Sequence, residues 1–333
     1  MRHGTSRYGT IAVLTALGAL LGACGAPMEE ERGAFESSTS ALLTEVTGFG
    51  TNAGALRMFT YIPAAMPTNA PVVVALHGCQ QSATTYGNAG WNKLADTYKF
   101  YVVYPQQQSA NNGSLCFNWF AAGDIARDQG EALSIKQMVD KLKATYSVDA
   151  SRVFVTGLSA GGAMAAVQLA AYPDVYAGGS IAAGIAYNCA SQSSALSCQQ
   201  GRVGLTATQW GDFVRNAYPG YTGRRPRVMI WQGDSDQTVN VKNMTELMEQ
   251  WTNVNGVDQV ADLVETVRGH AHDVYRNAAG TSVVETYKIT SGTHGLPIDP
   301  GTNVDQGGTV ATYFLDYNLF SSYYAAKFWG LAP

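Results

Sequence analysis

A serine stands at a corner between two kinds of local sequence. Residues 153–156 are β-branched or aromatic and predict a strand, whereas an alanine-rich run with helical character follows residue 162. The segment GLSAG at 157–161 lies between them and has the form Gly-x-Ser-x-Gly. A serine in such a turn has a strained backbone, so its neighbours two places away must be small. The pattern predicts that Ser159 is a nucleophile for acyl transfer; the alternative is a glycine-rich turn with a capping serine.

A serine hydroxyl needs a histidine base that a carboxylate orients. The sequence has five histidines, and His270, His272 and His294 follow Ser159 in the chain. The first two fall in a predicted hairpin arm. His294 lies in the glycine-containing loop SGTHG, after a predicted strand at 282–290. We therefore expect His294 to be the base, against the alternative of a surface loop histidine.

The carboxylate should follow a strand that lies between the serine and the histidine in the chain. A strand is predicted at 226–233 (PRVMIWQG), and Asp234 and Asp236 lie in the loop that follows it. Periodicity does not separate the two residues, and either could simply cap a turn. We expect at least one of them to orient His294.

Predicted strands and helices alternate along the chain. Apolar runs predict strands at 71–78, 100–105, 152–157, 177–186, 226–233 and 282–290. Helical spacing predicts helices at 91–99, 128–146, 161–173 and 239–256. This order predicts an α/β fold with a mostly parallel sheet and helices on both faces.

Four polar, glycine-containing loops follow predicted strands, namely HGCQQ, GLSAGG, QGDSDQ and SGTHG. Because parallel strands end at the same edge of a sheet, we expect these loops to lie together there. Trp119, Tyr187 and Trp231 are candidates for an apolar substrate cleft near that edge. The alternative for each of these aromatic residues is a place in the core.

The first residues have the composition of an export signal. A basic start precedes the apolar run TIAVLTALGALLGA, which is too short to span a bilayer comfortably. The run ends in LGAC, which resembles a bacterial lipobox, so Cys24 is expected to carry lipid; the alternative is ordinary cleavage nearby. We expect a signal peptide at 1–23, a polar tether at 24–44 and a single enzyme domain at 45–333. The protein would then be a lipoprotein of the cell envelope, or secreted, with membrane contact only through this lipid.

Cysteines and charges narrow the class of protein further. The four cysteines after Cys24 are an even number, as in exported proteins with disulfides. Three pairings are possible, and Cys79–Cys116 with Cys189–Cys198 is the most economical. A zinc site is the weaker alternative, because no CxxC or HExxH sequence occurs. The net charge of −4 and the scattered Lys and Arg residues indicate no nucleic-acid surface.

Many segments together resemble the catalytic domain of extracellular polyhydroxyalkanoate (PHB) depolymerases, within an esterase group that includes feruloyl and acetylxylan esterases. They include ALHGCQQ, GWNKLADTYKFYVVYPQQ, CFNWF, DQGEALSIKQMVDKL, VDASRVFVTGLSAGGAM, YPDVYAGGSIAAGIAYNCA, QGDSDQTV, SGTHGLP and FWGL. The resemblance runs from about residue 45 to the end. It implies an α/β-hydrolase fold and a serine carboxylesterase that needs no metal or organic cofactor.

The resemblance also implies roles for single residues. Ser159 matches the nucleophile and His294 the terminal histidine of the family. The family's acid motif, His-Gly-x-x-Asp-x-x-Val, aligns with 232–239 and selects Asp236 over Asp234. In this chain Gln232 replaces the histidine of that motif.

An oxyanion hole is implied at two backbone N–H groups, those of Cys79 and Ala160. A disulfide from Cys79 to Cys116 would hold the first of these loops still. The chain ends at FWGLAP, whereas secreted depolymerases usually continue into a substrate-binding domain. We therefore expect faster attack on soluble hydroxyalkanoate oligomers than on solid polyester. The alternatives are a feruloyl or acetylxylan esterase and, from another class, a non-catalytic surface lipoprotein on a hydrolase fold.

Overall fold

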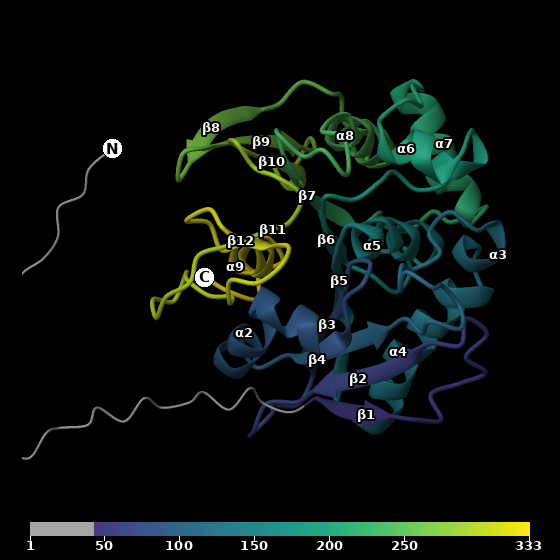
Figure 1. The fold of residues 1–333 in the computed structure, drawn as a ribbon, viewed down its shortest axis with the longest axis vertical. Coiled ribbons are helices and arrows are strands. Elements are labelled where there is room, and N and C mark those ends of the chain that lie inside the picture. The colour runs from purple at the N-terminus through teal and green to yellow at the C-terminus, as the bar shows by residue number, and fades with distance from the viewer. Residues whose placement is uncertain (1–42) are drawn as a thin grey trace, which may run out of the picture. The chain divides into compact units, whose positions relative to one another are not determined.

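A ten-stranded sheet forms the centre of the computed structural model, which describes residues 43–333 (Figure 1). Its strand order is β1-β2-β4-β3-β5-β6-β7-β10-β9-β8. In that order the strands span Thr44–Val46, Arg57–Tyr61, Tyr101–Gln106, Ala70–Leu76, Val148–Leu158, Gly178–Ala182, Arg227–Gly233, Ser282–Ile289, His270–Arg276 and Leu263–Val267. The predicted signal peptide, Cys24 and most of the predicted tether lie outside the described residues.

The central strands of the sheet pair in parallel, from β4 through β3, β5, β6 and β7 to β10. The outer strands, β1 and β2 at one edge and β9 and β8 at the other, are antiparallel. The predicted mostly parallel sheet is therefore confirmed. The outer strands β1, β2 and β8 were not predicted, because none of them forms a continuous apolar run. The residues of β1 and β8 are exposed or half-buried, and in β2 buried residues alternate with half-buried ones.

Helices cover both faces of the sheet, as its alternating side chains require. Val72 and Val74 of β3 pack into one core, and Val73 and Ala75 pack into the other. The first core contains residues of α4, α5, α7 and α8, and the second contains residues of α1, α2 and α9 (Figure 1). The α-helices span Ala83–Tyr86 (α1), Trp91–Tyr98 (α2), Ala122–Ile125 (α3), Gly130–Thr145 (α4), Ala160–Ala171 (α5), Ala195–Gln199 (α6), Ala207–Ala217 (α7), Lys242–Val254 (α8) and Ser321–Phe328 (α9).

The C-terminal segment packs back onto the second core. Trp329 stacks on Phe154 of β5 and on Trp91 of α2, with ring centroids 4.8 and 5.6 Å apart. A small parallel sheet of β11 (Leu296–Ile298) and β12 (Phe314–Asp316) lies between β10 and α9 in the chain. Among residues 43–333, no helix has both the length and the apolar character that crossing a bilayer requires.

His272 links the three strands at the antiparallel end of the sheet. Its Nδ1 lies 2.9 Å from Glu265 Oε1 on β8, and its Nε2 lies 3.1 Å from Glu285 Oε2 on β10. The ring also stacks on Tyr287, at 4.0 Å between centroids. Burial alone would lower the pKa of His272, but the hydrogen bonds to the two carboxylates and their negative charges together outweigh burial, so the net effect raises the pKa.

Replacing His272 by Gln should destabilise the protein in a pH-dependent way. The folded protein holds the proton of His272 more tightly than the unfolded chain does, so protonated His272 stabilises the fold. This stabilisation is complete below the unfolded pKa of about 6.5 and disappears as the pH rises through the folded pKa. In urea unfolding, the substitution should lower the free energy of unfolding by about 1–3 kcal/mol at pH 5.5 and by less at pH 9. The pH dependence should vanish when Glu265→Gln and Glu285→Gln are also present; an equal loss at both pH values would contradict the assignment.

Candidate active site

Ser159 adopts a backbone conformation that few residues other than glycine adopt. Its φ is +58° and its ψ is −120°, at the corner between β5 and α5. A Cβ added at Gly157 would collide with the carbonyl oxygen of Gly161, and one added at Gly161 would collide with the carbonyl oxygen of Leu76. The small residues on both sides of the serine are therefore a steric requirement of this corner.

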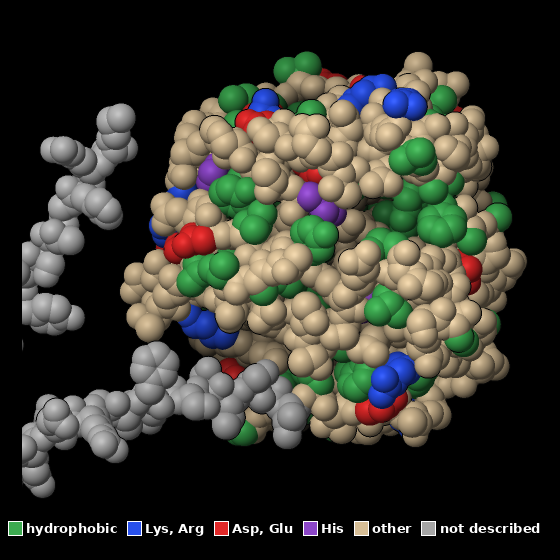
Figure 2. All heavy atoms as spheres, viewed as in Figure 1, with side chains coloured by type: hydrophobic (Ala, Val, Ile, Leu, Met, Phe, Trp, Pro, Cys, Tyr) green, Lys and Arg blue, Asp and Glu red, His purple; other side chains and the backbone are tan. Residues whose placement is uncertain are grey.

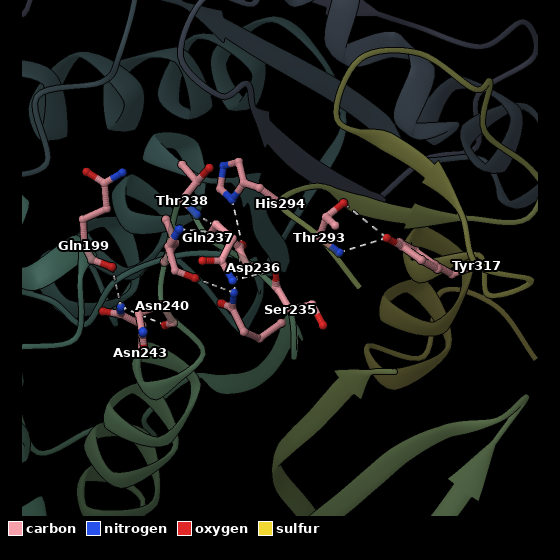
Figure 3. A network of polar contacts seen from close by, with 12 residues as sticks. Gln199, Ser235, Asp236, Gln237, Thr238, Asn240, Asn243, Thr293, His294 and Tyr317 are labelled. Atoms are coloured by element: carbon pink, nitrogen blue, oxygen red, sulfur yellow. Dashed lines mark hydrogen bonds and ion pairs between the residues drawn. The ribbon is translucent and has the colours of Figure 1, made fainter. Parts of the chain in front are cut away.

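The carboxylate of Asp236 is buried and fully hydrogen-bonded (Figure 3). Its Oδ1 accepts the backbone N–H groups of Thr238 and Val239, at 2.8 and 2.9 Å. Its Oδ2 accepts Nε2 of Gln232 at 3.0 Å and lies 2.8 Å from Nδ1 of His294. This arrangement fixes the orientation of the imidazole.

Asp234, the other carboxylate left open by the residue pattern, has a different environment. It is exposed, and its Oδ1 accepts the hydroxyl of the adjacent Ser235 at 2.8 Å. Its backbone N–H donates to Ile289 O at the end of β10. Asp234 therefore serves the turn, while Asp236 faces His294.

The loops that carry Asp236 and His294 meet through two glycines. A side chain at Gly233 would overlap the carbonyl of Gly292, so the two backbones are in direct contact. The N–H of Ser235 donates to Gly292 O at 2.9 Å, which joins the loops. Tyr317 adds a second restraint, because its hydroxyl accepts the N–H of Thr293 at 2.9 Å (Figure 3).

Ser159 and His294 line the same cavity, which has a volume of about 370 Å³. The cavity walls include the apolar side chains of Trp119, Phe120 and Ile185. Its lining contains no Lys, Arg, Asp or Glu side chain. Figure 2 shows hydrophobic side chains gathered on the surface between the positions that α6 and α3 have in Figure 1. The site therefore suits a neutral, largely apolar group.

Two of the three aromatic residues expected at the cleft lie elsewhere. Trp231 is part of the second core, where it stacks on Tyr287 at 4.1 Å and its Nε1 donates to Ser180 Oγ. Tyr187 is buried in the first core, and Gln250 of α8 hydrogen-bonds both its N–H and its carbonyl. The expectation for Tyr187 and Trp231 is corrected, since neither lines the cavity, whereas Trp119 does.

The cavity also contains the two backbone groups implied for an oxyanion hole. Cys79 and Ala160 line it together with Ser159, and Ala160 is the first residue of α5. Within residues 43–333, the N–H groups of Cys79 and Ala160 donate no hydrogen bond. Both are therefore available to an oxygen atom that develops negative charge at this point.

Both predicted disulfides are present. Cys79 pairs with Cys116, and Cys189 pairs with Cys198. Two disulfides are typical of a protein exported from the cytosol. The described residues include no group of three His, Cys, Asp or Glu side chains that could hold a metal ion.

The sequence showed that Gln232 replaces the histidine of the acid motif, but it did not indicate which residues Gln232 contacts. Its Nε2 donates to Asp236 Oδ2 and to Val239 O, at 3.0 and 2.9 Å. Its Oε1 is buried without a hydrogen-bond partner. The amide thus takes the position of the family's histidine and still supplies a donor to the carboxylate. Gln199 and Tyr313 also line the cavity, and no sequence pattern indicated them.

Comparison with known proteins identifies the family. Residues 56–269 match the protein-family model described as Esterase PHB depolymerase. Poly(3-hydroxyalkanoate) depolymerase C of Paucimonas lemoignei is 54% identical over 299 residues, which cover 90% of this chain and 72% of that protein. The chain belongs to the PHB depolymerase esterase family. It is a carboxylic ester hydrolase of the serine hydrolase type, and the class of enzyme expected from the sequence is confirmed.

Related esterases named for other substrates also match this chain. Feruloyl esterase B of Talaromyces funiculosus is 33% identical over 279 residues, covering 81% of this chain and 77% of that protein. The solved structure of an acetyl xylan esterase from Aspergillus awamori superposes with a TM-score of 0.70 and 28% identity, covering 76% of this chain and 94% of that one. This likeness confirms the α/β-hydrolase fold of this esterase.

Proposed function

We propose that this esterase hydrolyses hydroxyalkanoate polyester or its oligomers through an acyl-enzyme on Ser159. The observation that carries the proposal is the meeting of Ser159 with the His294–Asp236 pair at one uncharged, largely apolar cavity. A chain of short, saturated ester units is neutral and fits such a cavity. The 54% identity to a poly(3-hydroxyalkanoate) depolymerase supports the same substrate class.

In the proposed mechanism, Ser159 Oγ attacks the ester carbonyl while His294 Nε2 takes the hydroxyl proton. Asp236 holds Nδ1 of His294 and stabilises the imidazolium that forms. The N–H groups of Cys79 and Ala160 donate to the oxyanion of the tetrahedral intermediate. His294 then returns the proton to the leaving alcohol, and the bond between the carbonyl carbon and that alcohol breaks.

Water completes the proposed cycle by the same steps. His294 takes a proton from water, the resulting hydroxide attacks the acyl-enzyme, and Ser159 leaves with the proton from His294. The product acid ionises at neutral pH. Because the cavity lining offers no Lys or Arg, the carboxylate is held poorly and leaves for solvent.

The proposed domain division and location rest on the sequence. We propose a signal peptide at 1–23, a tether at 24–44 and an esterase domain at 45–333, with lipid on Cys24. The LGAC sequence supports lipidation, and the two disulfides support an exported enzyme. The lipid would hold the enzyme at the cell envelope.

Variants at the proposed triad should separate its two candidate acids. Ser159→Ala and His294→Ala should each lower kcat by about four to six orders of magnitude without changing thermal stability, because the triad acts as a unit. Asp236→Asn should lower kcat by about 10⁴-fold, since the His294 tautomer is no longer held. The matched control Asp234→Asn should stay within about twofold of wild type. Steady-state kinetics on a p-nitrophenyl ester measures kcat for all four variants. A large loss in Asp234→Asn with little loss in Asp236→Asn would exclude Asp236 as the acid.

A substrate panel should test the proposed ester class. Hydroxybutyrate oligomers should be hydrolysed with a kcat/KM at least about tenfold above that for methyl ferulate or acetylated xylan. Oligomers should also react faster than crystalline polymer film, because a chain must leave its crystal packing to enter the cavity. A preference for methyl ferulate or acetylated xylan would instead favour the esterase activities named for the more distant relatives.

Lipidation should be visible in cell fractions. The wild-type esterase should sediment with membranes, and a Cys24→Ala variant should appear in the soluble exported fraction. Immunoblotting of both fractions measures the shift, and mass spectrometry of the N-terminal peptide should show acyl groups in the wild type alone. Wild-type protein found entirely in the medium would contradict the anchor.

A further inference from the structure

Three arginines line one cavity far along the sheet from the proposed catalytic loops. Arg224, Arg225 and Arg227 border this arginine cavity, which has a volume of about 330 Å³. Arg227 begins β7, and Val283, which also lines the cavity, lies at the beginning of β10. The loops with the proposed acid and base follow the ends of the same two strands. The arginine cavity therefore lies at the opposite edge of the sheet.

No carboxylate balances the charge of these arginines within residues 43–333. None of the three guanidinium groups forms an ion pair there. The cavity lining contains no Asp or Glu side chain. Glu285 is a carboxylate whose charge acts on Arg227, but it already accepts the hydroxyl of Ser282 at 2.7 Å and lies 3.1 Å from His272 Nε2.

Burial makes these unbalanced charges unfavourable. Arg224 is exposed, whereas Arg225 and Arg227 are half-buried. Nη1 of Arg225 is buried and has no hydrogen-bond partner in the described part of the chain. Burial lowers the pKa of Arg227, the charge of Glu285 raises it, and the charge of Arg224 lowers it again. An anion bound in the cavity would therefore stabilise the charged side chains.

The end of α8 supplies only part of the missing negative charge. The helix ends at Val254, and both Val254 and Asn255 line the cavity. A helix C-terminus carries about half an elementary negative charge. One of its last carbonyls is already satisfied, because Nδ2 of Asn255 donates to Trp251 O at 3.0 Å. Three guanidinium groups at this helix end thus keep a net positive charge.

The backbone around the arginine cavity is held in place by the fold itself. The hydroxyl of Tyr221 lies 3.0 Å from Arg224 O, and the guanidinium of Arg225 lies over the Tyr221 ring at 5.1 Å. Pro226 has a fixed φ, and its carbonyl accepts Nδ2 of Asn255 at 3.2 Å. Such a preorganised site loses little conformational freedom when a ligand binds.

Phosphate has the chemistry that this cavity favours. A guanidinium group presents its N–H donors as a planar fork that matches two phosphate oxygens, and several forks can share one phosphate. Asn277 and Thr281 add neutral groups to the lining. Oδ1 of Asn277 accepts the N–H groups of Ala279 and Thr281, so the NH₂ group of this amide remains as a further donor.

We propose that the arginine cavity binds phosphate groups, either as free phosphate or in the headgroups of phospholipids. Arg224, Arg225 and Arg227 surround the phosphate oxygens and neutralise their charge. The net charge of the chain is −4, so a phosphate is attracted by this local cluster and not by the protein as a whole. The site does not depend on the proposed function, because it shares no lining residue with the catalytic cavity.

Calorimetric titration with sodium phosphate tests the site on the full chain. All proteins carry Cys24→Ala, so that no lipid anchor contributes, and sodium chloride keeps the ionic strength constant at pH 7.5. One phosphate should bind per chain with a Kd of about 0.1–1 mM. Arg224→Gln with Arg225→Gln should weaken binding at least about tenfold, because two of the three forks are lost.

A matched control removes the same charge elsewhere. Arg202 and Lys288 are exposed and do not line the arginine cavity. Arg202→Gln with Lys288→Gln should leave the Kd for phosphate within about twofold of the parent value. Both double variants should also keep the esterase kcat within about twofold, which shows that they are folded. Equal weakening in the two double variants would mean that general charge attracts phosphate, and it would overturn the proposal.

Vesicle sedimentation distinguishes the two sources of phosphate. Headgroup binding predicts that the protein sediments with phosphatidylglycerol vesicles and is released by excess inorganic phosphate or by the double arginine substitution. Binding of inorganic phosphate without binding of these vesicles assigns the site to free phosphate. Sedimentation that neither treatment reverses, together with no saturable phosphate binding, would contradict the site.

A second pair of substitutions keeps the test decisive if Arg224→Gln with Arg225→Gln does not fold. Arg224→Lys with Arg225→Lys keeps both charges but replaces each fork by a point charge, so phosphate binding should weaken by about three- to tenfold. An unchanged Kd in this lysine variant would overturn the assignment to these arginines. Absence of saturable phosphate binding in the parent protein would overturn the proposal whatever the variants do.

Discussion

The backbone conformation of Ser159 is the constraint on which the catalytic edge depends. A positive φ at a serine costs about 1–3 kcal/mol and persists only where the surrounding structure enforces it. Here β5 and α5 enforce it, and Gly161 lets the helix lie directly against the carbonyl of Leu76 at the end of β3. The same contact therefore sets the distance between the start of α5 and the loop that begins at His77. One close approach thus positions Ser159 and the two residues proposed for the oxyanion hole, Cys79 and Ala160.

A second close approach, between Gly233 and Gly292, brings the carboxylate to the histidine. The two loops follow neighbouring parallel strands, β7 and β10, so they begin at the same edge of the sheet. Backbone contact between the glycines and the hydrogen bond from Ser235 to Gly292 then fix their distance. Asp236 is restrained further because donors occupy both of its oxygens. The pair with His294 is thus held by backbone geometry before any substrate arrives.

Much of the architecture could be predicted because it depends on local patterns. Continuous apolar runs mark the central strands, since parallel strands are buried on both faces, and helical spacing marks α2, α4, α5 and α8. Helix α7 was missed although Thr206 and Gln209 form a capping box at its start. The predicted strand at 177–186 ends earlier, at Ala182, after which Ala183 has a positive φ. Glycine-rich sequence carries little information about where such a strand stops.

The sequence by itself predicted Ser159 as the nucleophile, because the steric demands of its corner are local, and it predicted His294 as the base by its position in the chain. It also predicted both disulfides, as the most economical of three possible pairings, and the structure confirms them. Residue spacing left Asp234 and Asp236 open and the family motif selected Asp236; the tertiary structure gives the physical reason, because only Asp236 is buried against His294. It also placed Tyr187 and Trp231 in the two cores and not at the cavity. Such outcomes depend on which distant loops converge, and residue spacing does not encode that.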